Sequence, residues 1–264
     1  NMLSAAENEY DTTGSEDALT KFFNTDLAEP YIPKVMTTQR LPEHLRDRAI
    51  DIGERVVPVG VRCLIANIDV QKNRFVVQVQ GISMVAPFDI TVIDRFDIKK
   101  SRRTDEDGDF YMVRPATFLE DWDLIESEVI DRVYPLADGS GRTMGIVMTT
   151  CDSGGYSRDK GESTTSMAYD FYRTLKKRGK AARFHLVKGI ASPNAPRTNI
   201  TYPDAVKKDA LSAARGDVPV LMLNSNLLKD TLHNRLDMTE PSKGLTTFPD
   251  WLGIQFYQEL CAEI

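Results

Sequence analysis

The chain has 264 residues, of which 41% are hydrophobic and 27% are charged, a balance typical of a folded globular protein and not of a disordered or fibrous one. Its net charge of −6 argues against tight nucleic-acid binding by bulk electrostatics, so any such affinity must come from local basic patches or from a partner. Three cysteines without CxxC spacing argue against a disulfide framework and a structural zinc site. No stretch approaches the ~20 apolar residues of a membrane span, and no secretion signal is recognisable, so we expect an intracellular protein.

The sequence changes character at about residue 60. Within residues 1–59 the first twenty are polar and acidic and prolines recur from Pro30 to Pro58, which predicts an irregular linker or extension. Residues 60–264 alternate apolar runs with amphipathic stretches, which predicts one domain with a sizeable core.

Five runs predict the strands of a central sheet. Arg62–Val70 is almost continuously apolar, Asn73–Gln80 alternates, and Pro87–Ile98 is rich in β-formers. Because these three are close in sequence, we expect an antiparallel meander. Thr143–Cys151 and Arg183–Lys188 follow, each after a helical stretch, and are expected to be parallel to the first strand.

The meander is followed by a charged segment and a helix. Asp97–Asp109 is predicted to be an exposed loop. Thr117 and Glu120 have the spacing of a capping box, and apolar residues recur at three- and four-residue steps from Trp122 onward, so we expect a helix that ends near Pro135.

Further helices follow the fourth strand. Ser163 is expected to open a helix that Gly179 closes. Beyond the fifth strand, Asp204–Arg215 and Ser225–Leu236 are predicted helices on either side of a short strand, Val218–Leu223.

This order of elements is that of a ribonuclease-H-like α/β fold. Three antiparallel strands precede two parallel ones, and the expected sheet order is 3-2-1-4-5 with flanking helices. The order of elements alone is also compatible with other α/β folds.

Two aspartates end the strands that this topology makes parallel neighbours. Asp69 ends the first strand and Asp152 the fourth, so their carboxylates should lie side by side at one edge of the sheet. Carboxylate oxygens bind hard divalent cations such as Mg²⁺ or Mn²⁺, and two such ions promote phosphoryl displacement. One aspartate at a strand end is ordinarily a solvated loop acid, so it is the pairing that favours a metal site.

Several segments resemble a known family. Ile65–Phe75, Thr150–Gly155, Pro196–Asp204 and Val220–Leu236 look like the nuclease half of lambda-type large terminase subunits, and Lys21–Tyr31 resembles the stretch that joins motor and nuclease in that family. The likeness covers most of the chain, and its most specific elements are the IDVQ-x-x-R strand end and the CDSGG turn.

The resemblance implies an endonuclease domain that cleaves concatemeric double-stranded phage DNA during packaging, by hydrolysis with two Mg²⁺ or Mn²⁺ ions. It carries over the first and second metal-binding aspartates as Asp69 and Asp152. The implied partners are double-stranded DNA, the packaging ATPase domain of the same polypeptide, the small terminase subunit and the portal protein. It implies no membrane, and the host cell cytoplasm as the location.

Two features depart from the family pattern. No G-x-x-x-x-G-K-[ST] loop occurs, and Gly155–Lys160 is wrongly spaced, so ATP hydrolysis is not expected of this chain. The family's third acid lies on a C-terminal helix, whereas Gln258–Ile264 resembles the stretch before it, so we expect the third ligand to be missing here. Glu259 or Glu263 is an alternative, although helix-surface acids are the commoner case.

Basic residues near the expected site are candidates for DNA contact. Lys188 closes the fifth strand, where an ammonium can reach a phosphate. Lys176, Lys177, Arg178 and Lys180 form a basic cluster that can follow a DNA backbone. For each of them the simpler interpretation is a solvated side chain.

Two further features have weaker implications. Lys99–Arg103 is a second basic cluster, with the same two interpretations. Asp94, on the third strand, is either an acid that supports the metal site or, as we expect, a surface residue.

Two other functions are compatible with the sequence. The domain can be a catalytically silent docking module for the packaging motor, the small subunit or the portal. An actin-like kinase or ATPase half also begins with an acid-ended strand and a hairpin. Such proteins need glycines after the first aspartate, whereas Val70–Asn73 follows Asp69 here, so that alternative is disfavoured.

Overall fold

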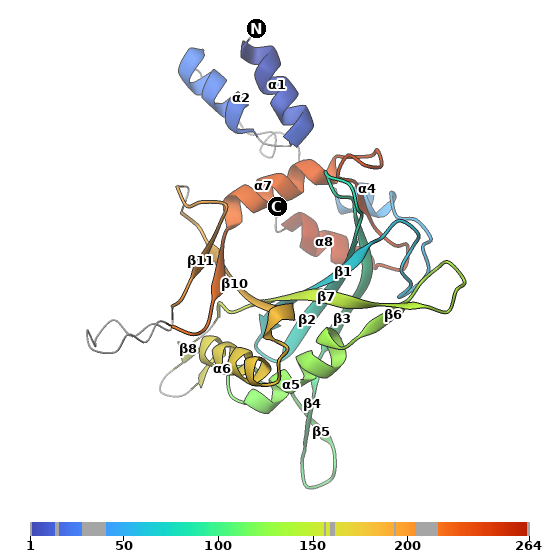
Figure 1. Cartoon of the computed structure of the whole chain (residues 1–264), viewed down its shortest axis with the longest axis vertical. Coiled ribbons are helices and arrows are strands. Elements are labelled where there is room, and N and C mark those ends of the chain that lie inside the picture. The colour runs from blue at the N-terminus through green and yellow to red at the C-terminus, as the bar shows by residue number, and fades with distance from the viewer. Residues whose placement is uncertain are drawn as a thin grey trace, which may run out of the picture. The chain divides into compact units, whose positions relative to one another are not determined.

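The computed structural model describes residues 2–13, 16–27, 41–155, 157–158, 162–192, 194–203 and 216–262 (Figure 1). The chain separates into two compact units. The sheet unit comprises Ile52–Met84 and Ile90–Asn224, and the terminal unit comprises Asn1–Asp51, Val85–Asp89 and Ser225–Ile264. The predicted boundary between an extension and a nuclease domain at residues 59 and 60 stays a prediction.

A mixed sheet forms the centre of the sheet unit. Its strands lie in the order β11-β12-β10-β7-β1-β2-β3, and β6 pairs with β7. The strands β1, β7, β10 and β12 are mutually parallel, whereas β2, β3, β6 and β11 are antiparallel to their neighbours. The bounds are β1 Cys63–Gln71, β2 Arg74–Ile82, β3 Ile90–Ile98, β6 Val133–Pro135, β7 Thr143–Asp152, β10 Phe184–Ile190, β11 Thr198–Thr201 and β12 Val220–Asn224.

The predicted fold class, a ribonuclease-H-like mixed α/β sheet, is confirmed. The five predicted strands correspond to β1, β2, β3, β7 and β10, which are neighbours in the sheet, and the predicted short strand corresponds to β12. The edge strand β11 was not predicted, because its four residues, Thr198–Thr201, are largely exposed and show no apolar alternation.

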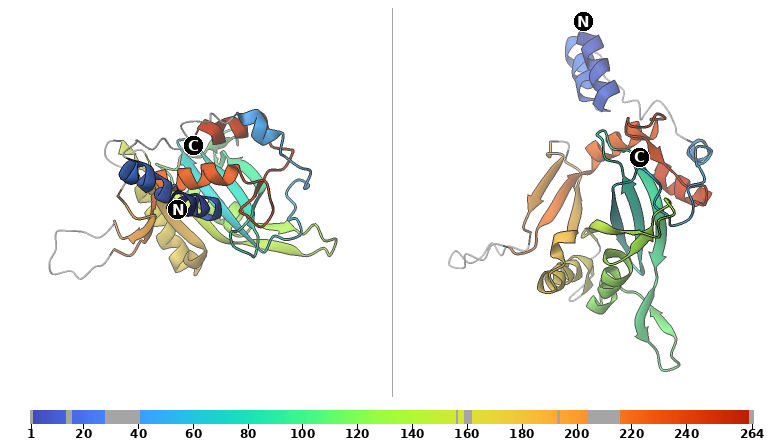
Figure 2. Two further views of the ribbon diagram at one scale, coloured as in Figure 1. Left: turned by 90° about the horizontal axis from the view of Figure 1, so that it is seen from above. Right: turned by 45° about the vertical axis from the view of Figure 1, so that its right-hand side comes forward.

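The helices α5 and α6 lie on one face of this sheet (Figures 1 and 2). Buried aromatic rings connect the helical elements to the sheet. The ring centroid of Trp122 lies 5.3 Å from that of Phe75 on β2 and 5.8 Å from that of Phe171 on α6, Thr164–Lys177. Phe171 in turn lies 5.2 Å from Phe184 on β10. Buried aromatic pairs of this kind add about 0.5–1.5 kcal/mol each beyond their burial. The sheet and α6 therefore share one core.

Both ends of α6 are as predicted. The Ser163 hydroxyl caps the first turn by accepting a hydrogen bond from the Ser166 amide. At the other end Gly179 has φ +74°, the left-handed conformation that ends a helix at lowest cost with glycine.

The helix predicted between Thr117 and Pro135 is wrong in its form and its end. The helical segment is a succession of η2 Leu119–Trp122, α5 Asp123–Ile125 and η3 Glu126–Ile130, which are a 3-10 turn, an α turn and a π turn. Phe118, and not Thr117, occupies the N-cap position, and no side chain caps it. The Glu120 carboxylate instead lies 3.5 Å from the guanidinium of Arg103. Val133 belongs to strand β6, opposite Gly145.

The predicted exposed loop over Asp97–Asp109 is exposed over most of its length, but it is not a loop throughout. It contains β4 Lys100–Thr104, which pairs with β5 Phe110–Met112 in a hairpin that extends away from the sheet (Figure 2). The hairpin base is anchored on fully buried Asp121. Its carboxylate accepts hydrogen bonds from the Ser101 hydroxyl, from the Arg103 guanidinium at 2.9 Å and from the Arg114 amide at 2.7 Å.

The terminal unit corrects the expectation of an irregular first segment. The first 26 residues contain helices, because Ala5, Ala6, Glu7 and Glu9 are good helix formers and the prolines begin only at Pro30. The predicted helix Ser225–Leu236 is confirmed as α7, whereas the predicted helix Asp204–Arg215 lies outside the described residues. The bounds are α1 Met2–Thr13, α2 Asp17–Lys21, η1 Phe22–Asp26, α4 Pro42–Arg46, α7 Ser225–Leu236, β13 Thr246–Thr247 and α8 Ile254–Ala262.

Aromatic packing also holds the terminal unit together. The ring centroid of Phe248 lies 5.8 Å from that of Phe256 and 5.5 Å from that of Tyr257, both on α8. The Asp89 carboxylate accepts three backbone N–H bonds from residues 242–245, which fixes that loop. Among the described helices, none is both long and apolar enough to cross a membrane.

Candidate metal centre

The two predicted acids lie on one face of the sheet, at the ends of adjacent strands. Asn67 on β1 is in register with Thr150 on β7, and the Thr150 hydroxyl donates a 2.8 Å hydrogen bond to the Asn67 side chain. Asp69 and Asp152 each follow this pair by two residues. Because side chains two residues apart share a face of a strand, both carboxylates belong to the face that carries Asn67 and Thr150.

The charges around Asp152 show that the predicted residues are electrostatic neighbours. Burial is the largest influence and raises the pKa of the Asp152 carboxyl. The Gly154 amide lowers that pKa through a 2.8 Å hydrogen bond, the charge of Asp69 raises it, and the ammonium of Lys188 lowers it. The net direction is upward, so ionising Asp152 next to Asp69 costs free energy.

The turn after Asp152 is fixed by backbone contacts. The amide and the hydroxyl of fully buried Ser153 both donate to the Val187 carbonyl on β10, each at 2.9 Å. The Thr165 hydroxyl, in the first turn of α6, donates to the Ser153 carbonyl at 2.8 Å. Sterics also favour glycine at position 154, since the Cβ of any other residue there would lie 3.1 Å from Oδ1 of Asp152.

Asp69 is the more exposed acid and has a side-chain partner of its own. Nε2 of Gln71, two residues further along β1, donates to Oδ2 of Asp69 at 2.9 Å. Lys188, near the end of β10, is exposed. Its charge lowers the pKa of the Asp152 carboxyl, and the residue before it, Val187, pairs with Asp152 in the β7–β10 register.

The donor set fits a hard divalent cation. Two carboxylates share one face at the ends of adjacent strands. Burial and then the charge of Asp69 raise the pKa of Asp152, and a cation between the two acids would offset both effects. Among the described residues, no group of three or more His, Cys, Asp or Glu side chains is placed to hold a metal ion. Of the two alternative third ligands, Glu259 lies on α8 and Glu263 lies outside the described residues.

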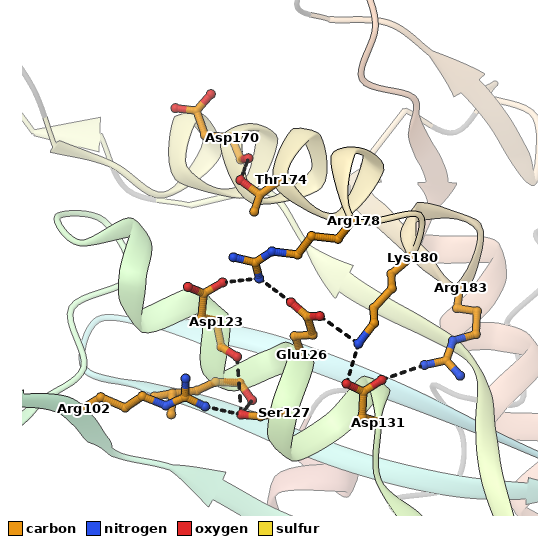
Figure 3. Close-up of polar contacts among 11 residues, drawn as sticks. Arg102, Asp123, Glu126, Ser127, Asp131, Asp170, Thr174, Arg178, Lys180 and Arg183 are labelled. Carbon is orange, nitrogen blue, oxygen red and sulfur yellow. Dashed lines mark hydrogen bonds and ion pairs between the residues drawn. The ribbon is translucent and has the colours of Figure 1, made fainter.

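Two of the predicted DNA-contacting residues are paired with acids (Figure 3). The Arg178 guanidinium contacts Asp123 at 2.7 Å and also contacts Glu126. The Lys180 ammonium lies 2.8 Å from Glu126 and 2.5 Å from Asp131. These contacts attach the chain after α6 to the helical segment 119–130 and to Asp131, the residue that follows it. Arg178 and Lys180 already form ion pairs within the protein. We therefore expect them to bind a DNA phosphate less strongly than exposed Lys176 and Lys177.

The ion pairs of Glu126 predict a pH-dependent contribution to stability. Burial raises the pKa of Glu126, but the contacts with Lys180 and Arg178 outweigh it, so the pKa lies below its ordinary value of 4.5. A lowered carboxyl pKa stabilises the fold above pH 4.5, and this stabilisation is lost as the pH falls through the lowered pKa. We expect Glu126→Gln to lower the free energy of unfolding by about 1 kcal/mol at pH 7, measured by urea denaturation. The difference should shrink below pH 4, and Glu128→Gln, an exposed acid of the same turn, should change little.

Asp94 is not the surface residue that the sequence led us to expect. It is 1% exposed, and its carboxylate lies 3.2 Å from Arg55, 3.3 Å from Arg132 and 2.9 Å from the Tyr134 hydroxyl, which donates to it. The strand register next to Asp94 is irregular, since Val79 pairs with Asp94 but Gln80 pairs with Val92. Its partners come from distant segments, so local sequence carried no signal for this buried cluster.

The fold and these strand ends define a ribonuclease-H-like α/β domain with two carboxylates at the ends of adjacent strands. Residues 2–264 match the family described as terminase large subunit gpA, endonuclease domain. The chain therefore belongs to that family, and its role is that of a nuclease in phage DNA packaging. A search of curated proteins found no significant match.

Proposed function

We propose that Asp69 and Asp152 hold divalent metal ions, Mg²⁺ or Mn²⁺, and that the domain hydrolyses phosphodiester bonds of concatemeric double-stranded phage DNA. The supporting observation is the acid pair, placed on one face at the ends of adjacent parallel strands, in which burial and then the charge of Asp69 raise the pKa of Asp152. Two like charges held at neighbouring strand ends are stabilised by a cation, so this arrangement favours a cation as its ligand.

The protein's own contribution to the reaction is positioning and charge. When bound, a divalent pair supplies Lewis acidity to a phosphoryl oxygen and lowers the pKa of water. Asp69 and Asp152 would hold those ions. The Gly154 amide orients the Asp152 carboxylate, and the Ser153 contacts keep its turn in place. Lys188 supplies positive charge next to the acids, where a DNA phosphate would need it.

Metal binding by the acid pair is testable without any activity. At a Mn²⁺ concentration 100 times the dissociation constant, binding should stabilise the fold by about 2.7 kcal/mol and raise the melting temperature by several degrees. Asp69→Asn and Asp152→Asn should abolish most of that shift while melting normally without metal. A variant that is stabilised as much as the wild type would contradict the assignment.

We further propose that exposed Lys176, Lys177 and Lys188 contact the DNA backbone, and that paired Arg178 and Lys180 contribute less. Three phosphate contacts predict that affinity falls about 40-fold between 50 and 200 mM salt, with little preference among duplex sequences. In fluorescence anisotropy titrations, each of Lys176→Ala, Lys177→Ala and Lys188→Ala should lower the salt slope by about one. A tight, salt-insensitive or sequence-selective complex would contradict this proposal.

A second candidate is a docking module that is catalytically silent by itself. It is favoured by one observation, that two acids and no third gather at the site within the described part of the chain. The proposed docking partners are the packaging ATPase domain of the same polypeptide, the small terminase subunit and the portal protein, in the host cell cytoplasm. Metal-dependent cleavage of supercoiled plasmid separates the two functions, since a docking module would leave the plasmid intact at any Mn²⁺ concentration.

A further inference from the structure

A line of side-chain hydrogen bonds runs from the first acid to the third strand. The Gln71 amide donates to Oδ2 of Asp69 at 2.9 Å. Nε of Arg74 donates to Oε1 of Gln71, also at 2.9 Å, and the other end of the same guanidinium lies 3.4 Å from Asp97. The order is therefore Asp97, Arg74, Gln71 and Asp69, with each group holding the next.

The strand register explains why these four side chains meet. Gln71 pairs with Arg74 across the β1–β2 turn, and Val76, two residues after Arg74, pairs with Asp97 on β3. Residues that pair across strands, or lie two apart on one strand, share a face. All four polar side chains therefore belong to the face that also carries Asp152.

Together these contacts fix the orientation of the Asp69 carboxylate, Gln71 directly and Arg74 through Gln71. An ionised carboxylate accepts at about four lone-pair sites, so the single amide contact at Oδ2 orients the group without saturating it. A free glutamine amide can rotate by half a turn and present its oxygen, which would repel Asp69. The Arg74 guanidinium prevents that rotation, because it can only donate and it already holds the Gln71 oxygen.

We propose that Gln71 and Arg74 are positioning residues that orient the Asp69 carboxylate for metal binding, with Arg74 acting through Gln71. This inference rests on the proposed metal site. The Asp97 carboxylate holds the Arg74 guanidinium, and the Lys99 ammonium lies 3.0 Å from that Asp97 carboxylate. Groups that orient a metal ligand typically change metal affinity by 10- to 100-fold when removed.

The test is a Mn²⁺ titration of the full chain, read by electron paramagnetic resonance of the free ion. We expect Gln71→Ala to weaken Mn²⁺ binding by about 10-fold or more and Arg74→Ala to weaken it by a smaller factor. The double variant should bind Mn²⁺ as weakly as Gln71→Ala alone, because a residue that acts through another adds nothing once the other is gone. Gln78→Ala is the matched control, since Gln78 lies on the same face, contacts Arg95 at 3.2 Å and should leave Mn²⁺ affinity unchanged.

The controls separate the two levels of the inference. If Asp69→Asn loses Mn²⁺ binding while Gln71→Ala keeps wild-type affinity, the metal site stands and the positioning role is overturned. Additive losses in the double variant would overturn the statement that Arg74 acts through Gln71. If Asp69→Asn itself binds Mn²⁺ like the wild type, the proposed site and the positioning role both fail. Metal-free melting curves, expected to be alike for all these variants, exclude unfolding as the cause of a loss.

Discussion

Replacing Asp69 or Asp152 with asparagine is expected to lower Mn²⁺-dependent nicking of supercoiled plasmid by at least about 100-fold. Removing a residue that merely supports a metal ligand costs 10- to 100-fold, so deleting the ligand charge itself should cost at least as much. Asparagine keeps the size of the side chain. For Asp152 it also removes a half-buried charge beside a like charge, so the metal-free fold should not suffer. Gel electrophoresis of plasmid over a Mn²⁺ series gives the rates.

Asp170→Asn is the matched control for this experiment. Asp170 is an exposed acid of α6 whose carboxylate pairs with Arg173 at 2.9 Å, and exposed pairs of this kind contribute little to stability. The control should nick plasmid at the wild-type rate. Comparable nicking by wild type, Asp69→Asn and Asp152→Asn would remove both acids from the reaction and favour the docking module.

Replacing Asp121 with alanine is expected to destabilise the protein by about 3–5 kcal/mol. The side chain is fully buried and holds Ser101, Arg103 and the Arg114 amide, so alanine leaves a guanidinium and two other donors without their acceptor. Urea denaturation should show a lower midpoint with an unchanged slope. Asp121→Asn should lose less, because its side-chain oxygen can still accept from the Arg114 amide.

The neighbouring residue provides the control, since Glu120 contacts the same arginine from a solvated position. Its side chain is 61% exposed and its carboxylate lies 3.5 Å from Arg103, so Glu120→Ala should cost less than about 1 kcal/mol. Equal losses for Glu120→Ala and Asp121→Ala would show that burial does not decide the strength of this anchor.

Local pattern was sufficient where an element is specified by its own residues. The apolar run that became β1, the alternation that became β2, and the Ser163 cap of α6 are each determined within a few residues. Such patterns reflect burial on one or both faces, which the local sequence must encode. The sheet neighbours followed from these elements because short connections restrict the possible topologies.

Prediction failed where a distant partner decides the structure. The charged residues of β4 read as a loop, because nothing near them reveals that buried Asp121 would receive Ser101 and Arg103. Likewise, Asp94 is buried only because Arg132 and Tyr134, from another part of the chain, neutralise it and donate to it. Charge patterns indicate exposure only when no such partner exists.

The candidate site was predicted in part. Asp69 and Asp152 were found because each ends a recognisable strand, and the register of β1 with β7 puts them on one face. The sequence indicated Gln71 and Arg74 only as part of the IDVQ-x-x-R motif and predicted no role for them, since their contacts depend on side-chain direction across the β1–β2 turn. The spacing of two residues between Asp69 and Gln71 was the available signal, because it places both on one face.

The tethers of α6 have a mechanical consequence. One end of this 14-residue helix is tied to the turn after Asp152 through Thr165, and the chain leaving its other end is tied through Arg178 to Asp123 and Glu126. A helix of that length is ~21 Å long, and the number of residues fixes the angle about the helix axis between side chains at its two ends. One inserted residue would turn one end by ~100° relative to the other, so only one tether could survive. The length of α6, and not only its sequence, therefore sets the alignment of the acid-bearing edge.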